Sequence, residues 1–252
     1  MWIWLHRLGS PPYFYRFAGR LLPWLWTACV LCLAAGLYWG LVVAPPDYQQ
    51  GDSYRIMFIH VPSAWLSLLS YVLMAGFSAG ALIWRVKVAE VLARSIAPLG
   101  ASFTFIALVS GSLWGKPMWG TWWVWDARLT SELILLFLYL GFIALSSAFD
   151  DPRRAARAAG LLAIVGVVNV PIIHFSVEWW NTLHQGPTIS LLGSSSIAPS
   201  MLLPLLVMVL ALHLYLLAVL LQRARCELIA RERSSRWVND LLPARGVGDE
   251  LA

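Results

Sequence analysis

The chain has 252 residues, of which 60% are hydrophobic and only 12% are charged; its mean hydropathy is +0.70. These values exclude an ordinary water-soluble domain and place the chain among integral membrane proteins. The formal net charge of +5 describes how Lys and Arg flank the apolar segments, so it gives no reason to expect nucleic-acid binding.

Six apolar segments are each long enough to cross a hydrocarbon core of about 30 Å, which takes about 20 helical residues. In lipid such segments are expected to be helices, because their backbone polar groups find no other partners there. The sequence therefore predicts an all-α polytopic membrane protein with a single domain over residues 1–252. The predicted helices cover approximately residues 21–43, 56–84, 96–113, 129–148, 158–176 and 199–221.

Lys and Arg are distributed unevenly between the two ends of these helices. If both termini are cytoplasmic, all 18 of them except Arg55, Lys116 and Arg128 lie in cytoplasmic segments. The positive-inside rule favours this orientation in a bacterial inner membrane, with residues 222–252 as a basic cytoplasmic tail. Three connecting segments then face the periplasm: residues 44–55, 114–128 and 177–198.

The segment between the third and fourth predicted helices is dense in tryptophan. It is interrupted by Gly115, Pro117 and Gly120. A tryptophan belt at a membrane surface normally has a few scattered rings, whereas a dense cluster on a glycine-containing loop predicts a flat aromatic platform for a large, planar, apolar ligand. The rings concerned are Trp114, Trp119, Trp122, Trp123 and Trp125.

Two histidines lie on the same side of the membrane as these tryptophans. His60 is near the outer end of the second predicted helix, and His184 is in the third outer segment. Two neutral imidazoles near an aromatic platform match an axial pair for haem iron. The alternative is that they are two unrelated histidines at the membrane interface. For His213, in the last helix, a packed and hydrogen-bonded role is expected.

The external arginines also match haem, which carries two propionates, because Arg forms bidentate pairs with carboxylates. Each arginine has an alternative partner within the chain. Arg55 can pair with Asp47 or Asp52, and Arg128 can form an i,i+4 pair with Glu132.

Asp126 directly follows the last tryptophan of the cluster. It can cap the fourth helix, whose N-terminus favours an acidic residue. It can equally orient a tryptophan N–H or pair with a basic loop residue, and both interpretations stay open.

The stretch from Trp114 to Asp126 reads W-G-x-x-x-W-G-x-W-W-x-W-D and is followed, after one residue, by R-L-T. This pattern resembles the tryptophan-rich WWD signature of a superfamily of haem-handling proteins. The six-helix size, with His60 before the motif and His184 after it, is similar to the CcmC family of the cytochrome c maturation system. Larger relatives, the CcmF- and CcsA-type cytochrome c synthases, share the signature but have more helices.

The resemblance implies that the chain holds haem b at its periplasmic face and delivers it to the membrane-anchored chaperone CcmE. The implied partners are the small membrane protein CcmD and the ABC transporter subunits CcmA and CcmB. Two alternatives remain, a transporter that moves haem through the bundle and an enzyme that forms the covalent haem–chaperone bond; no catalytic residue is assigned. The expected site comprises His60 and His184 as axial ligands, with Trp114, Trp119, Trp122, Trp123, Trp125, Asp126, Arg55 and Arg128.

Overall fold

The computed structural model describes residues 7–184 and 197–241. Within these residues the chain is built from helices and has no β-strand. Six helical segments are long and apolar enough to cross a membrane, so the predicted all-α, six-helix class is confirmed. The spans are Pro11–Val43, Asp52–Trp84, Lys87–Trp119, Ala127–Leu145, Pro152–Trp179 and Pro199–Arg231.

Several spans contain more than one helical element. The first and second spans consist of α2 (Pro11–Tyr38) with the π-helical turn η1 (Trp39–Val43), and of the 3-10 turn η2 (Asp52–Ile56) with α3 (Met57–Trp84). The third and fourth are α4 (Lys87–Trp119) and α5 (Ala127–Leu145). The remainder are α6 (Pro152–Gly166), α7 (Asn169–Trp179), α8 (Pro199–Arg231) and the short α9 (Arg236–Asn239).

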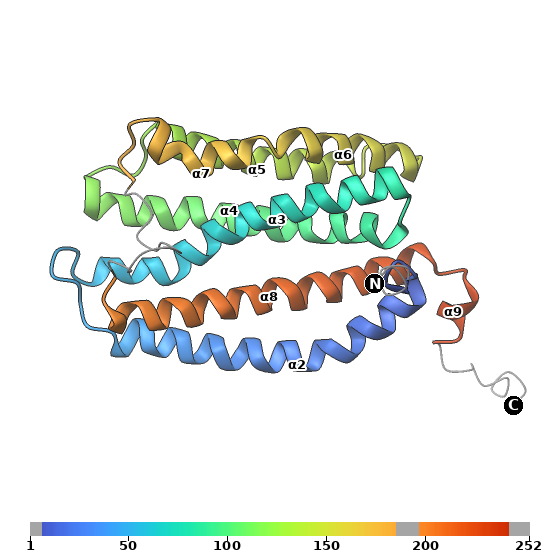
Figure 1. The fold of residues 1–252 in the computed structure, drawn as a ribbon, viewed down its shortest axis with the longest axis horizontal. Helices are drawn as coiled ribbons and strands as arrows, with labels where there is room; N and C mark the ends of the chain where they lie inside the picture. The colour runs from blue at the N-terminus through green and yellow to red at the C-terminus, as the bar shows by residue number, and fades with distance from the viewer. Residues whose placement is uncertain (1–6, 185–196, 242–252) are drawn as a thin grey trace, which may run out of the picture.

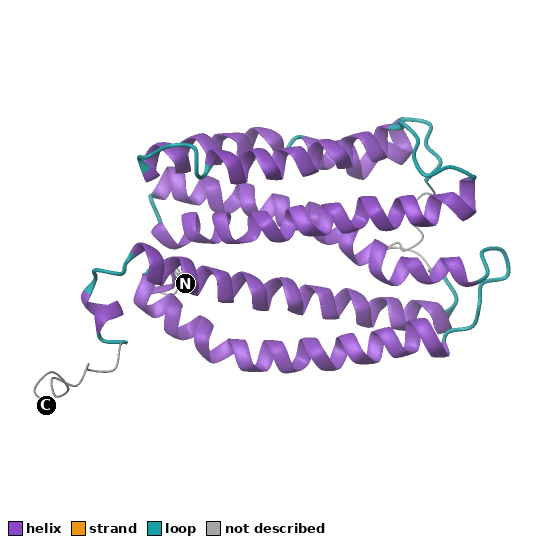
Figure 2. Cartoon of the chain, turned by 180° about the vertical axis from the view of Figure 1, so that it is seen from behind, coloured by secondary structure: helices purple, strands orange, loops and turns teal. Residues whose placement is uncertain are grey.

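The helices run side by side along the long axis of the molecule, and α2 starts at the same end of the bundle as α8 finishes (Figure 1). The view from behind shows the connections gathered at two opposite ends (Figure 2). The end where α3 meets α4 and α5 meets α6 is called the basic end. The opposite end, called the tryptophan end, contains residues 44–51, 120–126 and 180–184.

The centre of the bundle is filled by large side chains from neighbouring helices. α3 packs most extensively against α4, and α2 against α8. Tyr71 and Tyr139 are fully buried and meet edge to face at 5.0 Å, and the Tyr139 hydroxyl donates to the Ser67 carbonyl at 2.7 Å. Lipid is as apolar as these cores, so close packing and buried hydrogen bonds hold the helices together.

The predicted bounds of the first and third helices need correction. The first helix begins at Pro11, ten residues before the predicted start, because proline is well tolerated in the first turn. The third helix runs from Lys87 to Trp119, so it begins nine residues before the predicted start, and the first part of the predicted loop 114–128 is helical. Gly120 ends this helix in the left-handed conformation, with φ of 77°.

The last two predicted helices also differ from the structure. The fifth is divided between Gly166 and Asn169. The sixth continues to Arg231, so the start of the predicted tail 222–252 is helical. Residues 185–196 of the predicted outer segment 177–198 and residues 242–252 of the tail lie outside the described residues.

Candidate functional site

His60 is held in one orientation by α4. Its Nδ1 lies 3.0 Å from the Ser110 hydroxyl. Ser110 directs its own hydrogen to the Ile106 carbonyl, 2.6 Å away, so its oxygen is left to accept and His60 Nδ1 is the donor. This assigns the lone pair of the neutral ring to Nε2, which is the arrangement of a histidine prepared to bind a metal.

The His60 ring packs against Trp114 on α4. The two rings meet edge to face at 5.7 Å and 78°, and the Trp114 indole N–H donates to the Gln50 side chain at 2.9 Å. The imidazole lies close to the α4 backbone because position 111 is glycine. A Cβ atom on Gly111 would be 3.0 Å from His60 Cε1.

His184 is supported in a similar way by a tryptophan of α4. That tryptophan, Trp119, lies about one and a half turns after Trp114. Its ring is tilted on Trp119 with centroids 5.1 Å apart, and its backbone N–H donates to the Thr182 hydroxyl at 3.0 Å. A rise of 1.5 Å per residue puts Trp114 and Trp119 about 7.5 Å apart along the helix axis. α4 therefore carries the aromatic support of both histidines.

The second histidine also faces a carboxylate. His184 Nδ1 and Asp126 Oδ2 are 3.6 Å apart, beyond hydrogen-bond distance, and neither atom has another partner among the described residues. Burial and the nearby Arg128 guanidinium lower the pKa of His184, while Asp126 opposes this shift. The imidazole is therefore neutral at neutral pH, the form that binds iron.

Asp126 takes part in two of the three interactions that the sequence left open. It is the N-cap residue of α5, where its Oδ1 accepts the Leu129 N–H at 2.8 Å, and its Oδ2 faces His184. It does not orient a tryptophan: the indole N–H of Trp123 is buried without a partner in the described part of the chain.

The remaining tryptophans form an exposed surface beside these histidines. Trp119, Trp122 and Trp125 are 36%, 53% and 75% exposed, and Trp125 meets Trp123 edge to face at 5.4 Å. The hollow beneath the loop has a volume of only about 10 Å³, whereas ligand pockets usually have about 300–1,000 Å³. The exposed ring faces, and not the space beneath them, are available to a planar ligand.

Arg55 is engaged within the fold. Its Nε donates to Asp52 at 2.9 Å, and its two terminal nitrogens donate to the carbonyls of Gly40 at 2.6 Å and Ala44 at 2.9 Å. The expected alternative partner Asp52 is therefore the one observed. Three of the five N–H donors of the guanidinium are therefore engaged, and two of them cap the end of the first span.

Unlike Arg55, Arg128 is not bound by other side chains or carbonyls in the described part of the fold. The partly buried guanidinium forms no hydrogen bond or ion pair with residues 7–184 or 197–241. The expected alternative partner, Glu132, is buried and accepts a hydrogen bond from the Ser67 hydroxyl at 2.8 Å. Within the described residues, Arg128 is thus a cation at the tryptophan end that interacts with Glu132 and Asp126 only through its charge, and its N–H donors are left for a ligand.

Sequence reasoning missed the residues that hold the histidines in place. Ser110 and the glycines at positions 111 and 115 were detectable in principle, because small residues four apart on one helix indicate a close approach. A Cβ on Gly115 would be 3.1 Å from the Trp119 ring. Gln50 gave no signal, since nothing in its own segment relates it to Trp114.

Comparison with known proteins places this chain in a family. The family described as Heme exporter protein C (CcmC) matches residues 4–239. Heme exporter protein C of Escherichia coli (strain K12) is 53% identical over 246 residues, which cover 98% of this chain and 99% of the relative. The Haemophilus influenzae protein of the same name is 51% identical over 241 residues, covering 96% and 98%.

A more distant relative comes from a plant. The putative cytochrome c biosynthesis ccmC-like mitochondrial protein of Marchantia polymorpha is 46% identical over 191 residues, covering 76% of this chain and 79% of the relative. With a family match over most of its length and relatives more than 50% identical, the chain belongs to the CcmC family, described as Heme exporter protein C.

Proposed function

We propose that the chain binds haem at its tryptophan end and delivers it to the chaperone CcmE during c-type cytochrome maturation. The names of its relatives, a haem exporter and a cytochrome c biosynthesis protein, support haem handling. The observation that carries the proposal is the pair of oriented imidazoles. His60 and His184 each face a partner at Nδ1, and each packs on a tryptophan of α4.

The other residues of the tryptophan end suit the rest of the ligand. The exposed faces of Trp119, Trp122 and Trp125 offer stacking to a macrocycle, while Trp123 packs against Trp125 and Trp114 packs against His60. The free donors of Arg128 suit a propionate, whereas Arg55 is already engaged by Asp52 and the carbonyls of Gly40 and Ala44. We infer haem b, the form without covalent attachment, because Cys29 and Cys32 are followed by Leu33 and not by the histidine of an attachment motif.

The proposed setting is a bacterial inner membrane with the tryptophan end facing the periplasm. The positive-inside rule supports this orientation, since Arg55, Lys116 and Arg128 are the only Lys and Arg residues predicted at that face. CcmD and the ABC transporter subunits CcmA and CcmB are the proposed partners. The sequence contains no G-x-x-x-x-G-K-[ST] motif, so any ATP-driven step belongs to a partner.

Delivery is favoured over transport through the bundle or catalysis of bond formation. A path for haem between the helices would cross the fully buried Tyr71, Tyr139 and Leu135. Catalysis of bond formation would need an acid or a base beside the haem. Asp126 is the one acidic residue among residues 114–128, and its Oδ1 is already engaged in capping α5.

The direct test is to load the purified chain with haem and mix it with CcmE that lacks haem. We expect a Soret band on the chain that is transferred to CcmE. A chain that acquires no Soret band would contradict haem binding, and a band that is never transferred to CcmE would contradict delivery.

Trp119→Ala is expected to weaken haem binding only several-fold. Aromatic contacts contribute about 0.5–1.5 kcal/mol per pair beyond the area that they bury, and two iron ligands hold most of the haem. The measurement is a haem titration followed by absorption. Trp84→Ala, which removes a 72% exposed tryptophan from the basic end, is the matched control. Loss of binding as complete as that of a His184 variant would make the platform the principal anchor.

Arg128→Gln is expected to lower haem affinity by about 10- to 150-fold with the fold intact, because a charge-assisted pair with a carboxylate is worth about 1.5–3 kcal/mol. Glu132→Gln should leave haem affinity unchanged, because the amide oxygen can still accept from Ser67. Haem per folded molecule and thermal unfolding of both variants check this. Similar losses of folded protein in both, with normal haem content, would remove Arg128 from the site.

A further inference from the structure

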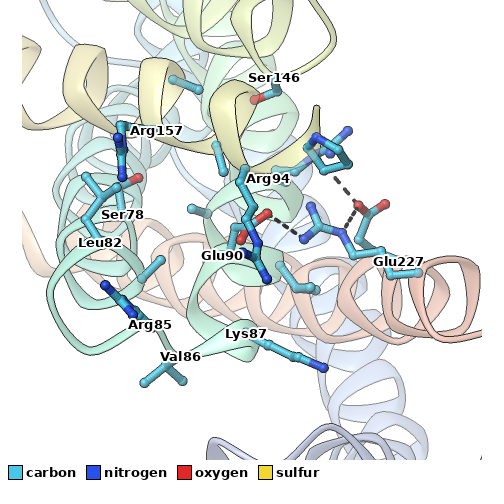
Figure 3. A pocket seen from close by; sticks show the side chains of 18 of the residues that line it. Ser78, Leu82, Arg85, Val86, Lys87, Glu90, Arg94, Ser146, Arg157 and Glu227 are labelled. Carbon is cyan, nitrogen blue, oxygen red and sulfur yellow. Dashed lines mark hydrogen bonds and ion pairs between the residues drawn. The ribbon is translucent and has the colours of Figure 1, made fainter. Parts of the chain in front are cut away.

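A large hollow lies at the basic end, opposite the tryptophan end. It has a volume of about 800 Å³ and is lined by residues of α3, α4, α5, α6 and α8, with Arg85 and Val86 from the connection between α3 and α4. Figure 3 shows several of its side chains. Part of the wall is apolar, including Leu82, Val91 and Phe142, and the rest is rich in arginine.

The carboxylates in this wall are already neutralised. Glu90 and Glu227 both accept hydrogen bonds from Arg231, at 2.6 and 2.7 Å, and Glu227 also pairs with Arg94 at 3.7 Å. Glu232 pairs with Lys87 at 3.1 Å. None of the three is left to neutralise a further cation.

Three arginines of the wall have no such partner. Arg85, Arg153 and Arg157 line the hollow, and none forms an ion pair with any residue that the structure describes. Arg85 has φ of 55°, the only non-glycine residue with positive φ in the described ranges. This backbone conformation is unfavourable for a side chain with a Cβ, and the short connection between α3 and α4 maintains it. Because these three arginines are not neutralised by described residues, the hollow carries a net positive charge.

A buried hydroxyl in the same wall also has no partner. Ser78 is 3% exposed, and its Oγ makes no hydrogen bond in the described part of the chain. Buried polar atoms are rarely left unsatisfied, so such an atom indicates a missing partner. Ser78 faces α6, because a Cβ on Gly160 would be 3.6 Å from Ser78 Cβ. Arg157 lies one turn before that glycine, and Figure 3 shows it near Ser78.

We propose that this hollow binds the phosphate of an anionic phospholipid from the leaflet next to the basic end. Phosphate oxygens accept from guanidinium and hydroxyl donors together, and the apolar part of the wall can take the start of the acyl chains. The hollow lies at the end of the spanning helices, where lipid headgroups are found. Haem is not the ligand inferred here, because no histidine or cysteine is among the lining residues.

Lipid retention by the full-length chain, measured by native mass spectrometry, tests the proposal. The probes are phosphatidylglycerol, which is anionic, and phosphatidylcholine, which is zwitterionic with no net charge. We expect preferential retention of phosphatidylglycerol and a loss of about fivefold on Arg157→Gln, the effect of one basic residue near a membrane surface. Arg233→Gln, at the same end but outside the hollow, is the control and should retain lipid normally.

Ser78→Ala separates ligand binding from folding. Without lipid its unfolding temperature should equal or exceed that of the unaltered chain, because the change removes only an unpartnered hydroxyl. With phosphatidylglycerol, the rise in unfolding temperature should be smaller than that of the unaltered chain. Equal retention of both lipids, or equal effects of Arg157→Gln and Arg233→Gln, would overturn the proposal. Displacement of the lipid by inorganic phosphate at similar concentration would overturn the lipid assignment.

Discussion

Replacing either His60 or His184 with glycine is expected to convert bound haem from two imidazole ligands to one. Second-shell changes alone usually cost about 10–100-fold in metal affinity, so loss of a direct ligand should weaken haem binding at least tenfold. Free imidazole should restore the original spectrum, because it occupies the position of the missing ring. Absorption spectra with and without imidazole measure both effects.

The matched control for this experiment is His174→Gly. His174 lies on α7, is exposed and stacks edge to face on Phe175, and its replacement carries the same helix penalty as the change at His60. Glycine costs about 1 kcal/mol in a helix interior. Unchanged spectra in both the His60 and the His184 variants would show that neither is a ligand.

Arg55→Gln is expected to destabilise the fold strongly, by about 3 kcal/mol. The side chain donates to the carbonyls of Gly40 and Ala44, which otherwise lack partners at the end of the first span, and each hydrogen bond to a charged group is worth about 1.5–3 kcal/mol. A large fall in unfolding temperature in detergent, with normal haem content per folded molecule, is the expected result.

Asp52→Asn is the control for Arg55. It weakens the ion pair but leaves the two carbonyl bonds, so its effect should be much smaller; an exposed ion pair is worth about 0–1 kcal/mol, and the Asp52 side chain is 78% exposed. If Arg55→Gln instead left stability unchanged and reduced haem content, Arg55 would act on a propionate as its position in the sequence suggested.

The fold was predictable because the membrane allows few alternatives. Six long apolar segments must be helices in lipid, and this prediction does not depend on the identity of any single residue. The errors fell where two tendencies compete. Pro117 and Gly115 suggested a loop from Trp114 onwards, yet α4 continues to Trp119, since the packing of Trp114 on His60 stabilises the helix beyond what local propensity indicates.

The site was predictable in its residue types but not in its contacts. The motif identified the tryptophans and Asp126. Only the structure shows that the two oxygens of the Asp126 carboxylate act separately, one capping α5 and the other facing His184. The two arginines looked equivalent in sequence. They differ only because the end of the first span folds back on Arg55, while Glu132 is drawn to Ser67 on another helix. Such distinctions depend on contacts between distant segments, which have no local pattern.

The double role of Asp126 restricts which residue can occupy its position. Asn would cap α5 equally well but would bring no charge to His184. Glu would bring the charge, but its longer side chain is a poor cap. Aspartate alone satisfies both requirements, so the start of a transmembrane helix and the negative charge that faces a loop imidazole depend on a single residue.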